Sequence, residues 1–162
     1  MPSMTRRTAL AAFAACALAT AVAFPAGAQP KAGEPLKIGF VYVSPIGDAG
    51  WTFQHDTGRK EMEKALGAKV TTKYIESVPE GADAERVIRE LAQSGHQLIF
   101  TTSFGYMNPT IKVAGTFPKT QFEHATGYKS AKNVGIYNAR FYEGRYLAGI
   151  VAGRMTKSNV AG

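Results

Sequence analysis

Cysteine is almost absent from this chain, and the single one, Cys16, lies inside an apolar run near the start. The rest of the sequence therefore has no internal disulfide, no thiol nucleophile and no cysteine-based metal site. The three histidines, His55, His96 and His124, share none of the spacings that are typical of metal ligands. We expect neither a metal nor another cofactor.

Motifs of nucleotide chemistry and of catalysis are also missing. The turn at residues 47–50, Gly-Asp-Ala-Gly, lacks the three-glycine spacing of a dinucleotide-binding loop, and no Walker-type loop occurs. No serine occupies a nucleophile elbow, and no pair of carboxylates is placed together by its spacing. The Lys and Arg residues behind the net charge of +7 are scattered, which argues against nucleic-acid binding. These absences favour a binding protein over an enzyme.

The first 28 residues have the organisation of a secretory signal peptide. Arg6 and Arg7 precede an apolar run at residues 8–24, and Ala-Gly-Ala at residues 26–28 is a small-residue cleavage motif. We therefore expect a periplasmic protein, exported by the general route or, given the paired arginines, by the twin-arginine route. Lipid anchoring through Cys16 is the less favoured alternative, because the residues before it form a poor lipidation motif.

Strands and helices alternate after a linker at residues 29–35. Strands are predicted near residues 37–43, 69–75, 98–101, 121–124 and 133–137, and helices near 51–66, 82–93, 109–117 and 141–156. Alternation of this kind indicates an α/β fold with a parallel, doubly wound sheet. Met62, Ala65 and Leu66 predict an apolar face on the first helix, and the glycines and alanines of the last helix predict close packing against the sheet.

Two predicted loops follow strands at the edge where open α/β sheets bind small ligands. The first loop carries Asp48, which either caps the next helix or contacts a ligand, and leads to Trp51, which either stacks on a ligand or packs in the core. The second loop contributes four further candidates for ligand binding, Ser103, Phe104, Tyr106 and Asn108. His55 is better explained as a packed or capping side chain than as a base.

Three stretches carry a family-specific pattern: the strand at residues 37–43, the segment Gly-Asp-Ala-Gly-Trp-Thr at 47–52, and residues 134–157. The last contains Phe-Tyr-Glu-Gly-Arg-Tyr-Leu-Ala-Gly at 141–149 and Ala-Gly-Arg-Met-Thr-Lys at 152–157. Together they resemble the basic membrane protein family of ABC-transporter solute-binding proteins, the type that binds purine nucleosides. Such proteins have two α/β lobes that close around a nucleoside or a base.

The resemblance implies that residues 36–162 form the first lobe of a periplasmic-binding-protein-like type I fold, and that the second lobe is missing from this chain. It implies that Trp51 stacks on a purine base or nucleoside, with Asp48 beside it and Thr52 where the family usually has Asn. The implied partner is the permease of an ABC importer in the inner membrane. The alternatives are a sugar- or amide-binding protein of the same fold and, less favoured, an exported nucleosidase or hydrolase that uses Asp48.

Overall fold

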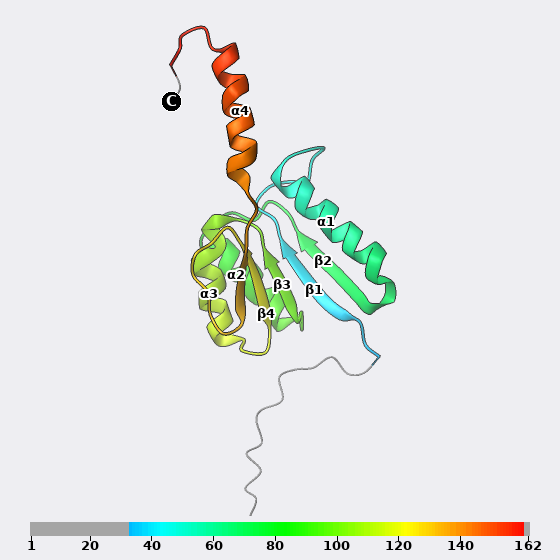
Figure 1. The fold of residues 1–162 in the computed structure, drawn as a ribbon. Coiled ribbons are helices and arrows are strands. Elements are labelled where there is room, and N and C mark those ends of the chain that lie inside the picture. Colours follow the sequence, from blue (N-terminus) through cyan, green and yellow to red (C-terminus); the bar gives the residue numbers. More distant parts are fainter. Residues whose placement is uncertain (1–32, 161–162) are drawn as a thin grey trace, which may run out of the picture.

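The structure, a computed structural model, describes residues 33–160; the predicted signal peptide and the start of the linker lie outside the described residues. Five strands form one parallel sheet in the order β2-β1-β3-β4-β5 (Figure 1). The strands are β1 (Leu36–Val41), β2 (Val70–Ile75), β3 (Leu98–Thr101), β4 (Gln121–Ala125) and β5 (Val134–Tyr137). The helices are α1 (Trp51–Leu66), α2 (Ala82–Gln93), α3 (Met107–Thr116) and α4 (Phe141–Met155), with short 3₁₀ turns η1 (Gly67–Lys69) and η2 (Phe104–Tyr106). The predicted α/β class and element order are confirmed.

Helices lie on both faces of the sheet, with α1 on one side and α2 and α3 on the other (Figure 1). Alternate residues of β1 point to opposite faces: Ile38 and Phe40 belong to the cluster under α1, and Val41 to the cluster under α2 and α3. Gly39 lets α2 approach closely, because a Cβ at this position would lie 3.0 Å from a methyl carbon of Leu91. The apolar stripe predicted for α2 is buried, as expected.

The inner face of α1 differs from the expectation. Its buried residues are polar, Thr52, Asp56 and Arg59, whereas Leu66 is 41% exposed. Of the apolar residues expected on this face, Met62 packs against the sheet cluster. The prediction of an apolar contact face is therefore wrong for most of this helix, because hydrogen bonds and ion pairs attach it to the sheet.

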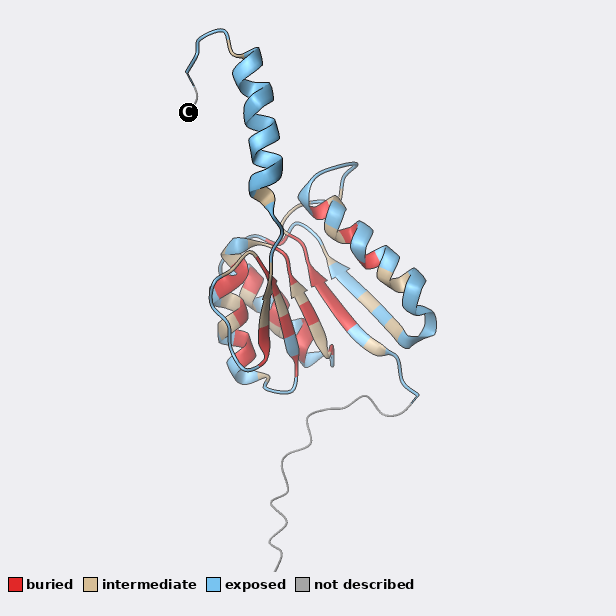
Figure 2. Ribbon diagram, in the orientation of Figure 1, coloured by how far each residue is buried: buried red, intermediate tan, exposed pale blue. Residues whose placement is uncertain are grey.

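The position of α4 also corrects an expectation. The helix projects away from the sheet beyond the carboxyl ends of the strands (Figure 1), and every residue of α4 after Phe141 is exposed (Figure 2). The reason is the segment at residues 138–140, which carries the chain outward from β5 and not back across a face of the sheet. No helix within residues 33–160 has both the length and the apolar character needed to cross a membrane.

Candidate ligand-binding site

The loops after β1, β3 and β4 meet at the carboxyl edge of the sheet, beside the start of α4. Together with residues 138–148, they border an open hollow of about 1180 Å³, whose lining includes Trp51 from α1, Ser103 and Phe104 after β3, and Thr126 after β4. A hollow at this edge is where a parallel α/β sheet offers backbone groups and loop side chains to a small ligand.

Trp51 is the first residue of α1, directly after Gly50, whose φ of 97° favours glycine. The residue is 36% exposed, and its indole Nε1–H donates a hydrogen bond of 2.5 Å to the carbonyl oxygen of Thr102. The ring also lies 4.6 Å from the ring of His55 and 5.5 Å from that of Phe141, between centroids. These contacts hold the indole in one orientation, and more than a third of the residue's surface remains accessible to solvent.

A second, smaller hollow of about 540 Å³ adjoins the first on the α1 side of the sheet. Its lining includes Trp51, His55, Tyr137 and Phe141, so the indole borders both hollows. His55 keeps its place through a contact of 2.9 Å between its Nδ1 and the carbonyl oxygen of Trp51. Burial raises the pKa of the Tyr137 hydroxyl, with the nearby Glu123 carboxylate adding to the effect, so this hydroxyl is uncharged at neutral pH.

Asp48 does not cap α1. The N-cap position belongs to Gly50, and within the described residues no side chain makes a capping hydrogen bond there. A capping side chain acts from the N-cap position itself, and Asp48 lies two residues too early for that. It is exposed on a loop that is anchored by a 2.8 Å hydrogen bond from the Ile46 amide to the Glu76 carboxylate.

Two of the expected ligand contacts lie in the interior of this lobe. Thr52 is buried, and its hydroxyl shares a 2.7 Å hydrogen bond with the hydroxyl of Ser44. Tyr106 is also buried, and its hydroxyl donates a 2.5 Å hydrogen bond to the carbonyl oxygen of Val78. Both side chains hold loops in place, and neither is brought to the hollow.

The remaining expected residues lie on the loop after β3 and at the start of α3. Phe104 is 55% exposed at the hollow. The Ser103 hydroxyl and the Gly105 amide donate hydrogen bonds of 2.5 Å and 3.0 Å to the Glu80 carboxylate, which ties this loop to the loop after β2. Asn108 is exposed, and its side-chain oxygen accepts a 2.8 Å hydrogen bond from Lys129.

Several residues of the two hollows were not among the predicted site residues. Thr126 follows β4, Tyr137 ends β5, Asn138 comes directly after β5, and Phe141 begins α4. The rule that identified the loops after the first and third strands, applied to the last two strands, would have found them. Arg140 and Glu143 also border the larger hollow, and they form an exposed ion pair of 3.2 Å with each other.

No group of three or more potential metal-ligating side chains occurs within residues 33–160. The arrangement offers instead a flat, oriented aromatic surface, a second exposed aromatic ring and a few hydroxyl and amide groups. Such a lining suits the binding of a planar or partly apolar small molecule.

The fold is that of ABC-transporter solute-binding proteins. A solved solute-binding protein from Aeropyrum pernix K1 superposes with a TM-score of 0.61 at 25% identity, covering 74% of this chain and 32% of that one. The family model described as Bmp, ABC transporter substrate-binding protein PnrA-like, matches residues 36–162. The chain therefore belongs to this family, as the resemblance of its sequence predicted.

Two curated relatives are similar over most of the chain. "Purine-binding protein BAB2_0673" of Brucella abortus is 58% identical over 90% of this chain and 41% of its own length. "Putative ABC transporter glucose-binding protein TsgA13" of Haloferax volcanii is 43% identical over 84% of this chain and 34% of its own length. The chain thus spans well under half the length of the curated relatives that it matches.

Proposed function

We propose that this chain is part of the exported solute-binding protein of an ABC importer and that its ligand is a purine base or nucleoside. The observation that carries the proposal is the partly exposed indole of Trp51, fixed by its bond to Thr102 at the carboxyl edge of the sheet. A flat indole stacks well on a planar base. The relative named as a purine-binding protein, at 58% identity, supports this ligand class.

The proposed mechanism is closure of two lobes around the ligand. The described sheet forms one wall, with Trp51 and Phe104 as its aromatic contacts, and the outward course of residues 138–140 makes that segment the hinge. A ligand that bridges both walls stabilises the closed form, which the permease in the inner membrane then recognises. Residues 1–28 direct export to the periplasm. The protein binds its ligand without converting it.

A titration followed by nuclear magnetic resonance tests the ligand class directly. Trp51 is the only tryptophan, so the chain has one indole N–H resonance. We expect adenosine to shift this resonance in a saturable manner and ribose at the same concentrations to leave it in place. Affinity of these residues is expected to be weak, because the described sheet forms only one wall of the proposed cleft. A resonance unmoved by adenosine, adenine and guanosine would contradict the proposal.

A sugar is the second candidate ligand. The relative named as a putative glucose-binding protein, at 43% identity, favours it, and an exposed indole also packs on the apolar face of a sugar ring. A thermal-shift panel that compares purines with hexoses separates the two: stabilisation by glucose alone would select the sugar.

A further inference from the structure

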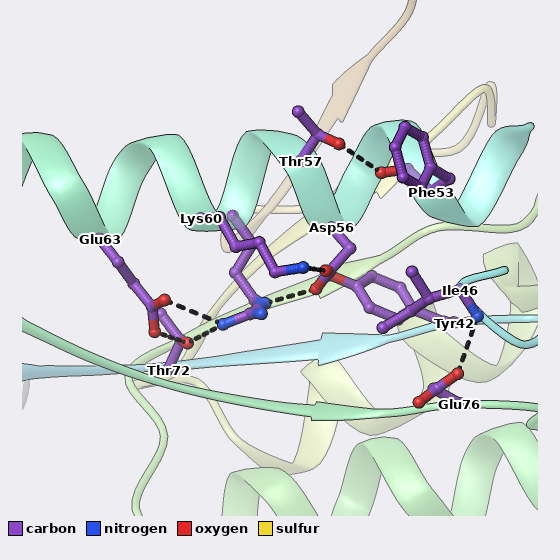
Figure 3. A network of polar contacts seen from close by, with 10 residues as sticks. Tyr42, Ile46, Phe53, Asp56, Thr57, Lys60, Glu63, Thr72 and Glu76 are labelled. Atoms are coloured by element: carbon purple, nitrogen blue, oxygen red, sulfur yellow. Dashed lines mark hydrogen bonds and ion pairs between the residues drawn. The ribbon is translucent and has the colours of Figure 1, made fainter. Parts of the chain in front are cut away.

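A buried polar network lies between α1 and the first two strands (Figure 3). Its centre is the carboxylate of Asp56, which is 1% exposed. This carboxylate accepts a 2.7 Å hydrogen bond from Nε of Arg59, forms a 2.8 Å ion pair with Lys60 and accepts a 3.4 Å hydrogen bond from the hydroxyl of Tyr42, which follows β1. Burial alone would raise the pKa of Asp56, but the bonds from Arg59 and Lys60 outweigh it, so the carboxylate stays ionised.

The guanidinium of Arg59 extends the network to β2. Its Nη1 donates a 3.0 Å hydrogen bond to the hydroxyl of Thr72 and forms a 3.0 Å ion pair with Glu63, which also accepts a hydrogen bond from Thr72. The guanidinium lies 4.7 Å from the ring centroid of Tyr74, within the range of a cation–π contact. Helix α1 is therefore held by directional bonds to two different strands.

Directional bonds fix the position of a helix more closely than apolar contact does. Apolar packing of similar volume is often as stabilising as a buried ion pair, so stability alone does not account for this interface. A hydrogen-bonded network, in contrast, has all its donors and acceptors paired only when the helix lies at one position along its axis and at one rotation about it. Trp51 begins the same helix, five residues before Asp56, and its indole N–H is bonded to the carbonyl oxygen of Thr102.

We propose that the network of Tyr42, Asp56 and Arg59 is a positioning device, which sets the rotation of α1 and so presents the indole of Trp51 to the ligand. Asp56 is a positioning residue because its buried side chain lies away from both hollows. The inference rests on the proposed function for its ligand, although the orientation of the indole can be measured without one.

The variant Asp56→Asn removes the charge and keeps the volume. In the full chain without ligand, we expect the indole N–H resonance of Trp51 to shift and broaden in this variant. We expect the affinity of the variant for adenosine to fall about tenfold. The matched control is Val113→Ala, which opens a cavity on the opposite face of the sheet. It should lower the melting temperature while leaving the indole resonance and the adenosine affinity as in the wild type.

The result that would overturn the inference is a folded Asp56→Asn protein with the resonance and affinity of the wild type, or a Val113→Ala protein that loses affinity equally. If Asp56→Asn does not fold, Tyr42→Phe, which deletes one hydroxyl, takes its place. We expect the same shift of the indole N–H resonance and the same loss of adenosine affinity. If the wild type does not bind adenosine, the proposed function fails, and the ligand-free resonance still decides the inference.

Discussion

The indole N–H of Trp51 donates to the carbonyl oxygen of Thr102 at 2.5 Å, which joins the first residue of α1 to the residue directly after β3. These residues are far apart in sequence, and the bond adds a side-chain link to the two hydrogen bonds that Thr102 donates to the carbonyl oxygen of Val41 at the end of β1. The carbonyl group of Thr102 is thereby satisfied by a side chain that also borders both hollows. The site and the sheet edge are built as one unit.

Substitutions of Trp51 separate the flat ring from the hydrogen bond. Trp51→Phe keeps an aromatic face and loses the N–H, so adenosine affinity should fall about tenfold; Trp51→Ala removes both and should lower it about a hundredfold. Ligand-observed resonance titration measures both values. Leu66→Ala, at an exposed side chain at the far end of α1 and outside both hollows, is the control and should bind as the wild type does. Unchanged affinity in Trp51→Ala would refute the role of the indole.

Glu80 is expected to organise the loop after β3, because its carboxylate accepts from both Ser103 and Gly105. Glu80→Ala should cost about 1 kcal/mol of unfolding free energy, since the surface position allows water to replace part of the lost bonding. It should also weaken adenosine binding through the displaced Phe104. Glu80→Gln retains an acceptor and should restore most of both, as measured by urea unfolding and titration. Equal losses in the two variants would show that the charge alone matters.

The stability of the fold should depend on pH through its two buried histidines. Burial lowers the pKa of His124, which contacts the Thr101 hydroxyl at 3.0 Å, and burial likewise lowers the pKa of His96. The unfolded chain takes up protons as the pH falls below about 6.5, whereas the folded chain resists protonation. The free energy of unfolding is thus at its full value above that pH and declines by up to about 1.4 kcal/mol per pH unit for each histidine.

Urea unfolding at pH 7.5, 6.5 and 5.5 measures this slope. The variant His124→Gln should show a shallower dependence than the wild type, because one of the two groups is gone. A wild-type stability that is flat across this range would show that the folded and unfolded pKa values are the same.

The chain should leave adenosine intact. Asp48, the residue that a nucleosidase mechanism would use, is exposed outside both hollows, and we expect chromatography to detect no release of adenine during prolonged incubation. Release of adenine that disappears in Asp48→Asn would establish the hydrolase alternative instead.

The sheet and α2 could be predicted from local patterns, because β-branched strands and a clear apolar stripe each point to one structure. The attachment of α1 could not, since Thr52, Asp56 and Arg59 have the helical spacing of a buried face but a polar composition. The direction of α4 could not either. Its apolar residues lie all round the helix, so the pattern indicates burial but does not indicate which surface the helix packs against.

The lining of the two hollows was likewise predicted only in part. Strand ends and loop composition identified Trp51, Ser103 and Phe104, which line the larger hollow. They could not exclude Tyr106, because the turn η2 rotates the side chains along this loop and sends this one into the core. Residue spacing in a loop does not reveal such a rotation.

The most direct test of the central claim is the set of nuclear Overhauser effects between adenosine and the chain in a saturated sample. We predict contacts from the base protons H2 and H8 to the ring protons of Trp51. Saturable binding with base contacts to other residues and none to the indole would contradict it.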